Sequence, residues 1–231
     1  LITGIAFRDV TNGPSPDWMA RRLTAIGQRP ISALVDITNY VMFDLGRPLH
    51  AYDMDKIHGG ELIVRQADGG EPFAALNEKT YEMEAGMITI GDAEGVDDLA
   101  GVMGGERTGV SYDTTGMFLE IAVFDPISVA TTGRKLNLNS DARYRFERGL
   151  DSESPIWAAG HIARMVTDIC GGTASVPVTM GPGVDWKRSI FLAADKVESL
   201  SGMVIEAVEQ QRILQVLGFT VTAVDGGFDV A

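Results

Sequence analysis

Apolar residues recur at helical spacing near the start of the chain. Residues 13–27 read GPSPDWMARRLTAIG, in which Ser15 can cap a helix, Pro16 suits its first position and Gly27 ends it. The apolar residues that this helix would place on one side are Trp18, Leu23 and Ile26. The pattern therefore predicts a short amphipathic helix with these side chains buried.

A second helix is predicted from about Leu34 to Leu45, because Gly46 and then Pro48 follow it. From Leu62 to Phe124 the pattern changes to short apolar runs that are separated by glycine and acidic residues, which is typical of sheet. A helix from about Pro126 to Lys135 is predicted next.

The last part of the chain contains a long helix and a separate group of short elements. Residues 154–172, SPIWAAGHIARMVTDICGG, carry an apolar stripe that a glycine pair ends. The stripe consists of Ile156, Ile162, Met165, Val166 and Ile169. Met180–Ser189 is the best linker candidate, and beyond it we expect a strand over 190–192, two helices and a hairpin. Together these patterns predict an α+β fold, a mixed, sheet-rich domain with flanking helices followed by a small helical module with a β-wing.

The composition is that of a globular protein whose chain can bury a real core. The 231 residues are 45% hydrophobic and 22% charged, which allows one large domain or two smaller ones. A single cysteine, Cys170, excludes an intramolecular disulfide and is typical of a reducing compartment. No run approaches the ~20 apolar residues that span a bilayer, so we expect a cytoplasmic protein without a membrane partner. Because the chain begins without Met and stops directly after a strand-like segment, we also expect it to be a piece of a longer protein.

The charge balance restricts how this chain can meet nucleic acid. A formal net charge of −13 argues against binding by bulk electrostatics, which depends on Lys and Arg displacing counterions. The segment from Arg134 to Arg148 is the exception, since it holds five basic residues against two acidic ones. Taken alone, a solvated helix face is the simpler interpretation of that cluster.

Glu120 is the most informative single residue, because it interrupts the apolar strand MFLEIAVF with a carboxylate. Strand alternation places it on the same face as Phe118 and Ala122. A carboxylate that is buried there without a partner costs free energy. Either that face is exposed or paired with an arginine, or Glu120 forms the floor of a pocket and accepts a hydrogen bond from a ligand.

Two further segments place small residues beside glycine or charge. Gly101–Gly105, GVMGG, is a tight turn or a loop whose backbone amides meet a ligand. Asn139–Gly149, NSDARYRFERG, is a charged loop or a tight wall beside a phosphate or sugar. Phosphate loops, dinucleotide fingerprints, cysteine-pair zinc sites and histidine pairs at metal spacing are absent from the sequence, so no metal site is predicted.

Four motifs, in this order, resemble the β subunit of bacterial phenylalanine–tRNA ligases (phenylalanyl-tRNA synthetases) in the region of its editing (B3/B4) domain. They are RPISALVDITNYVMFDLGRPLHAYD, AGVMGGERTGV, LEIAVFDP and NSDARYRFERGLD, and they lie within roughly the first 180 positions. The resemblance implies that residues 1–29 end a preceding domain and that 30–182 form the editing domain. It also implies that 187–231 are the truncated start of the next, winged-helix-like (B5) domain.

The resemblance further implies a hydrolytic site that removes tyrosine wrongly attached to the tRNA for phenylalanine. An apolar synthetic pocket cannot strongly reject a substrate that only adds a hydroxyl, whereas a second site built to hydrogen-bond that hydroxyl can discriminate by several orders of magnitude. By resemblance, Glu120 accepts the hydrogen bond from the tyrosine phenol.

The family's residues on one side of the pocket match Thr38, Asn39 and His50, which are the expected catalytic residues. Thr38 and Asn39 would face the cavity from their helix, and the turn Gly46–Pro48 would fold His50 back beside them. We expect the three to bind the amino acid and the tRNA terminus or to orient water, with His50 a candidate proton acceptor.

The resemblance assigns the other side of the pocket to small residues. The expected substrate-binding residues, besides Glu120, are Gly101, Gly104, Gly105, Ser140 and Ala142. Ala142 matches a small residue that keeps the cavity open. Ser140 stands where some relatives have Thr, which puts selectivity among tyrosine analogues in question. The residues expected to contact tRNA are Arg134 and Arg145.

For the intact enzyme, the resemblance implies accurate ATP-dependent phenylalanyl-tRNA aminoacylation in the cytoplasm. ATP and magnesium would bind elsewhere, with no cofactor in this segment. The implied partners are the aminoacylated 3′ end of tRNA and the ligase α subunit, in a heterotetramer of two α and two β chains. The alternative function is a non-catalytic structural or tRNA-docking scaffold of the β subunit.

Overall fold

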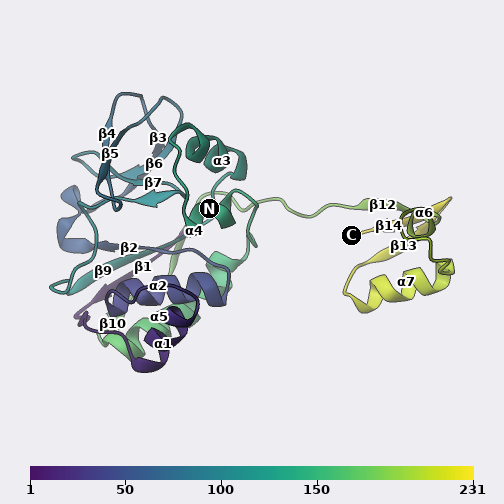
Figure 1. The fold of residues 1–231 in the computed structure, drawn as a ribbon, viewed down its shortest axis with the longest axis horizontal. Helices are drawn as coiled ribbons and strands as arrows, with labels where there is room; N and C mark the ends of the chain where they lie inside the picture. Colours follow the sequence, from purple (N-terminus) through teal and green to yellow (C-terminus); the bar gives the residue numbers. More distant parts are fainter. The chain divides into compact units, whose positions relative to one another are not determined.

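The computed structural model describes all of residues 1–231 and divides the chain into two compact units, Leu1–Gly183 and Val184–Ala231. Each unit combines helices with antiparallel strands, so the predicted α+β class is confirmed (Figure 1). The boundary predicted after residue 29 falls inside the first unit, because strand β1 (Ile2–Arg8) pairs along its whole length with β9 (Gly116–Ala122). None of the helices combines the length and the apolar character needed to cross a bilayer.

The central sheet of the first unit has the order β10-β1-β9-β2, and β11 also pairs with β1. The strands not yet defined are β2 (His50–Asp53), β10 (Thr173–Ala174) and β11 (Val178–Met180). Three helices cover one face of this sheet (Figure 1): α1 (Asp17–Ala25), α2 (Ala33–Asp44) and α5 (Ser154–Cys170). Alternate residues of β9, such as Leu119, pack against these helices, while Phe118 and Ala122 belong to a second core on the opposite face.

A second sheet, of order β3-β6-β7-β8, and a separate hairpin enclose that second core. Their bounds are β3 (Ile63–Gln66), β4 (Pro72–Ala75), β5 (Lys79–Glu82), β6 (Ile88–Gly91), β7 (Val96–Leu99) and β8 (Met103–Gly104), preceded by the 3-10 turns Met54–Lys56 and His58–Gly60. Helices α3 (Pro126–Lys135) and α4 (Asp141–Phe146) contribute Val129 and Phe146 to the same core. The central sheet thus separates a helical layer from a second layer of strands.

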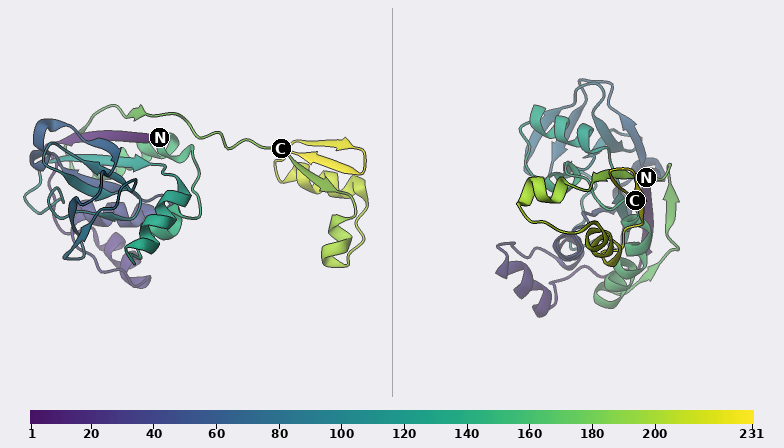
Figure 2. Two further views of the ribbon diagram at one scale, coloured as in Figure 1. Left: turned by 90° about the horizontal axis from the view of Figure 1, so that it is seen from above. Right: turned by 90° about the vertical axis from the view of Figure 1, so that its right-hand side faces the viewer.

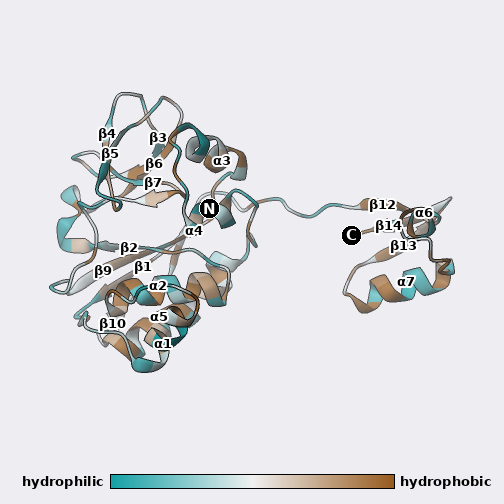
Figure 3. Cartoon of the chain, in the orientation of Figure 1, coloured by the Kyte–Doolittle hydropathy of each residue, from teal (hydrophilic) through white to brown (hydrophobic).

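The second unit contains the elements that the sequence predicts for it. They are β12 (Ile190–Ala193), α6 (Lys196–Ser201), α7 (Ala207–Val216), β13 (Val221–Val224) and β14 (Gly227–Val230), with the sheet order β12-β14-β13. Residues 181–189 between the units form neither helix nor strand (Figure 2) and are mostly hydrophilic (Figure 3). The predicted linker therefore coincides with the division between the units, apart from Met180, which ends β11.

Several local predictions are wrong. Trp18 and Ile26 are not buried by the first helix, since they are 39% and 53% exposed, and Met19 is buried with Leu23 instead. Ser15 does not cap that helix, because its hydroxyl donates to Asp36 Oδ2 at 2.5 Å.

The apolar stripe of α5 begins later than predicted. Ile156 is 56% exposed, whereas Ile162 and Val166 are buried. Between Asn139 and Gly149 the predicted charged loop contains the helix α4.

Candidate functional site

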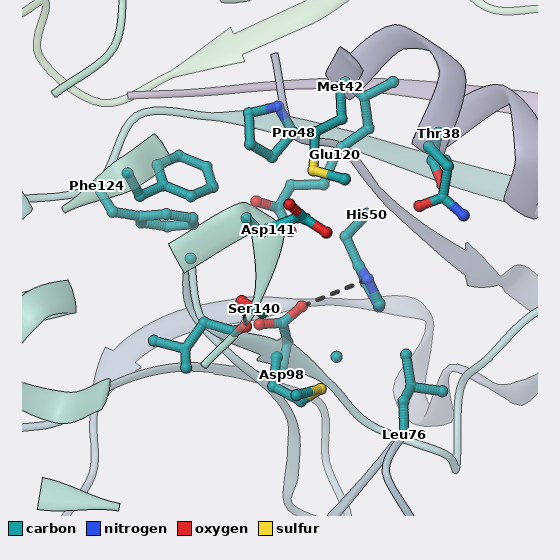
Figure 4. Close-up of a pocket in the computed structure, with 18 of the residues that line it drawn as sticks. Thr38, Met42, Pro48, His50, Leu76, Asp98, Glu120, Phe124, Ser140 and Asp141 are labelled. Atoms are coloured by element: carbon teal, nitrogen blue, oxygen red, sulfur yellow. Dashed lines mark hydrogen bonds and ion pairs between the residues drawn. The ribbon is translucent and has the colours of Figure 1, made fainter. Parts of the chain in front are cut away.

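A cavity of about 370 Å³ lies in the first unit, between α2, the start of β2, the β7–β8 segment and the start of α4 (Figure 4). Eight of the residues that the sequence assigned to a site line it. They are Thr38, Asn39, His50, Gly101, Gly104, Glu120, Ser140 and Ala142. Four separate stretches of chain therefore meet at one cavity.

His50 reaches the cavity by strand pairing rather than by the predicted turn. It is the first residue of β2, and the antiparallel register places it directly opposite Glu120 on β9. Because alternate strand residues share a face, His50, Tyr52 and Glu120 all lie on the face of the central sheet that meets the second core. The edge of the His50 ring packs on the Tyr52 ring, with 4.4 Å between the ring centroids.

Glu120 is a buried carboxyl at the wall of the cavity, 6% exposed. Its Oε2 accepts a hydrogen bond from the Tyr52 hydroxyl at 3.1 Å, and no other side chain hydrogen-bonds the carboxyl. Burial raises the pKa of Glu120 to about 7, although the Tyr52 hydrogen bond and the charge of Arg47 both act to lower it. Around neutral pH this group is therefore both an acceptor and a titrating acid.

Asp98 is a second buried carboxyl in the cavity, and the sequence analysis missed it. Its Oδ2 lies 3.5 Å from the Tyr52 hydroxyl and 3.6 Å from His50 Nδ1. Burial raises the pKa of Asp98 well above its usual range, and the charge of Glu120 raises it further. The sequence does contain an indication of this carboxyl, because two aspartates precede the glycine loop in DDLAGVMGG.

The imidazole of His50 is held in its neutral form. Burial lowers the pKa of His50 to about 4. Its Nε2 has no hydrogen-bond partner within the chain. A neutral imidazole at a cavity can accept a proton from water, which a protonated one cannot.

Arg47 supplies the positive charge nearest to this cluster and was also missed. It is 1% exposed, its Nη1 donates to the carbonyl of Ala122 at 2.6 Å, and its guanidinium lies over the Phe146 ring. Burial lowers the pKa of Arg47 to about 10, while the charges of Asp151 and Glu120 oppose that shift. The sequence did not indicate that Arg47 is buried, because it lies in the predicted turn Gly46–Pro48.

Ser140 joins two walls of the cavity. Its hydroxyl accepts a hydrogen bond from Arg143 N at 3.0 Å, which caps α4, and donates to the carbonyl of Val102 at 2.6 Å. Gly105, in contrast, does not line the cavity. A side chain there would meet the Phe73 ring and the carbonyl of Asp97.

The two arginines predicted to contact tRNA lie outside the cavity lining. Arg145 stacks on the Phe43 ring, 4.8 Å from its centroid, and donates to the carbonyl of Asp141. Arg134 is exposed on α3. Much of the basic cluster is engaged within the fold, as Arg143 shows by its ion pair with Glu147.

No group of three or more His, Cys, Asp and Glu side chains is arranged to hold a metal ion. We assign none of the residues of this chain to magnesium.

Comparison with known proteins places this cavity within a recognised domain. A family model described as "B3/4 domain" matches residues 2–171. The chain is 50% identical over 219 residues to the phenylalanine–tRNA ligase beta subunit of Ruegeria pomeroyi, covering 95% of this chain and 27% of that protein. It is 48% identical over 221 residues to the beta subunit of Paramagnetospirillum magneticum, covering 96% and 28%.

Among solved structures, the chain is similar to an N-terminal fragment of the phenylalanyl-tRNA synthetase beta subunit from Pyrococcus horikoshii. The TM-score is 0.45 at 14% identity, with 98% of this chain and 63% of that chain covered. The chain thus spans little more than a quarter of the length of the curated relatives it matches.

Proposed function

Because the chain belongs to the B3/4 domain family, we propose that its cavity is the hydrolytic editing site of a phenylalanine–tRNA ligase beta subunit. The substrate would be tyrosine that is wrongly esterified to the tRNA for phenylalanine. The reaction would be hydrolysis of that ester, which releases tyrosine and the free tRNA.

The observation that carries this proposal is the buried carboxyl of Glu120 at the cavity wall. One oxygen is bound by Tyr52, and the other, Oε1, has no partner in the chain. A tyrosine phenol could donate to that oxygen. Phenylalanine would bury it without a hydrogen bond, and an unpaired buried carboxyl is costly. The same pocket would therefore favour tyrosine over phenylalanine.

Three residues that line the cavity with Glu120 support a hydrolytic role. The imidazole of His50 is neutral and lines the cavity, and its Nε2 has no partner in the chain. The ring would accept a proton from an attacking water once Nε2, which is closed off from solvent here, meets that water. Thr38 and Asn39 lie beside it on α2, where they would hold the amino acid and the tRNA terminus. The Thr38 hydroxyl donates to the carbonyl of Val35 at 2.7 Å, so its lone pairs are left to accept from the substrate.

The remaining features of the proposal concern the intact ligase. With a net charge of −13 this segment would only admit the aminoacylated 3′ end, past Arg134 and Arg145. The wider tRNA surface, the α subunit, the two-α two-β assembly and the sites for ATP and magnesium would be supplied by the rest of the enzyme. Residues 187–231 would begin the next domain of the beta subunit.

The test is hydrolysis of tyrosine-charged phenylalanine tRNA by the complete ligase that contains this segment. Glu120→Ala should reduce the preference for the tyrosyl over the phenylalanyl ester by roughly 10²-fold, since it removes the acceptor of a hydrogen bond inside a dry pocket. Ala142→Trp should block the cavity and abolish hydrolysis of both esters. Phenylalanine charging should persist in both variants.

The matched control is Glu82→Ala, which removes an exposed carboxyl on β5 outside the cavity. If Glu120→Ala and Ala142→Trp both hydrolyse like the parent enzyme, the cavity is not an editing site. The scaffold function would then replace the proposal.

A further inference from the structure

The hydroxyl of Tyr52 lies between two buried carboxyls. It is 3.1 Å from Glu120 Oε2 and 3.5 Å from Asp98 Oδ2. A hydroxyl carries one proton, so it can donate to only one of these oxygens at a time. The Tyr52 oxygen forms a hydrogen bond with the second carboxyl only when that carboxyl is itself protonated and donates to it. Two carboxyls this close do not ionise together readily, so the geometry points to a shared proton.

The surrounding charges decide which carboxyl keeps that proton. The buried guanidinium of Arg47 favours the ionised form of Glu120. The nearest basic group to Asp98 is His50, which is 3.6 Å away and neutral. Ionised Glu120 with protonated Asp98 is therefore the favoured arrangement, and the Tyr52 hydroxyl then donates to Glu120.

Glu120 borders two cavities, and the hydrogen bond from Tyr52 limits the orientations of its carboxyl. Glu120 lines a second cavity of about 620 Å³, which is formed mainly by apolar residues of β1, β3 and β11 on the far side of Tyr52. Tyr52 itself lines that second cavity. Since its hydroxyl is the only side-chain partner of Glu120, it holds Oε2 and leaves Oε1 able to accept a hydrogen bond from a ligand.

We propose that Tyr52 and Asp98 are positioning residues for substrate selection: Tyr52 holds Glu120 as the acceptor of a para-hydroxyl group, and Asp98 keeps the shared proton. This inference rests on the proposed function, because it concerns selection between the tyrosyl and phenylalanyl esters. It adds two residues that the sequence analysis did not assign to a site, and it predicts how selection varies with pH.

The groups that can influence Glu120 are few. The titratable and charged side chains around it are Arg47, His50, Tyr52, Asp98 and Asp141, with Glu61 across the second cavity and Asp97 acting on Asp98 and Tyr52. The pKa of His50 is about 4, so His50 stays neutral near neutral pH. Burial raises the pKa of Asp97 to about 6, but its charge acts on Asp98 and Tyr52 and not directly on Glu120, so a midpoint near 7 that moves in Tyr52→Phe should report Glu120.

The experiment compares hydrolysis of tyrosyl and phenylalanyl esters of the same tRNA by the complete ligase across the pH range around 7. The ratio of the two rates cancels the pH dependence of ester hydrolysis itself. In the parent it should rise with pH through about 7 as Glu120 ionises. Tyr52→Phe should move that midpoint upward by about one pH unit, because it removes a hydrogen bond that stabilises the ionised carboxyl.

Asp98→Asn provides a second variant with a different expectation. Because Asp98 holds its proton while Glu120 titrates, a neutral amide of the same size leaves the charge beside Glu120 unchanged, so the midpoint and the tyrosyl preference should both stay near those of the parent. Tyr81→Phe is the matched control, because the Tyr81 hydroxyl accepts from Asn77 Nδ2 at 2.8 Å and lies outside the cavity. This control should keep the parental midpoint.

Two outcomes overturn the proposal. One is a parental midpoint in Tyr52→Phe, and the other is loss of the tyrosyl preference in Asp98→Asn, which would make Asp98 the acceptor. Failure of the proposed function would give a different result, because the parent enzyme would then show no preference for the tyrosyl ester that Glu120→Ala removes.

Discussion

Gly104 is the residue against which the ring of His50 rests. A Cβ at this position would lie 2.2 Å from His50 Cε1. Gly101 has a positive φ of 71°, which favours glycine, but Gly104 does not. The glycine at 104 is therefore explained by the room that the imidazole needs. The sequence indicated a glycine loop near a ligand, but the histidine that fills the space comes from a strand more than fifty residues earlier.

Gly104→Ala should displace the His50 ring and so lower hydrolysis of the tyrosyl ester by about 10²-fold, the lower end of what a positioned general base contributes. The His50 ring is bounded by Tyr52, so it cannot move aside freely. Single-turnover hydrolysis would measure the effect.

The control for that substitution is Gly160→Ala in α5, where no atom lies within 4 Å of the added Cβ. It should keep parental hydrolysis and stabilise the helix by about 0.5–1 kcal/mol. Parental hydrolysis in Gly104→Ala would show that the position of the His50 ring does not matter.

At the scale of elements, the short helix α4 is joined to the glycine segment by the hydroxyl of Ser140. This one group caps α4 and bonds the carbonyl of Val102. Sequence reading predicted α2 as Leu34–Leu45, close to the observed Ala33–Asp44, because periodicity and the following Gly and Pro are local signals. It missed β1 and β2, since a short strand is defined by a partner far along the chain, here β9.

Ser140→Ala should lower the free energy of unfolding of the first unit by about 1–2 kcal/mol, because a helix cap and a second hydrogen bond are lost together. Ser140→Thr, which keeps the hydroxyl, should lose much less. Denaturant unfolding followed by the fluorescence of Trp18 and Trp157, which both lie in the first unit, would measure the difference.

Ser189→Ala in the exposed linker is the control and should leave the unfolding curve unchanged. Equal stability of Ser140→Ala and the parent would mean that the cap and the Val102 bond contribute nothing measurable. The same comparison shows whether Thr is structurally equivalent to Ser at position 140.

At the scale of the whole molecule, the chain consists of two units joined by residues that form no regular structure. Within the linker, Lys187 and Arg188 are both exposed. A segment whose backbone makes no helix or strand hydrogen bonds fits into the active site of a protease more easily than a helix or a strand does. The predicted linker at Met180–Ser189 was accurate because Gly, Pro and polar residues are a local compositional signal.

Limited trypsin digestion should therefore cut first after Lys187 or Arg188, and it should release a first unit that resists further cleavage. Buried Arg47 and Arg143 should be among the slowest sites. Mass spectrometry of early fragments identifies the cut. A first cut within residues 1–183 would contradict the division, and Gln at both 187 and 188 should delay the release.

The sequence by itself determined the helices with clear periodicity and terminal residues, the linker, the fold class and eight of the residues that line the cavity. It did so because these depend on local pattern or on motifs that resemble a known family. Only the tertiary structure decided how those residues meet. The register of β2 on β9 sets His50 opposite Glu120, and the meeting of β7 with that face brings Asp98 to the Tyr52 hydroxyl. Protonation of the carboxyl pair follows from burial and from Arg47, which are properties of the assembled core and not of any segment.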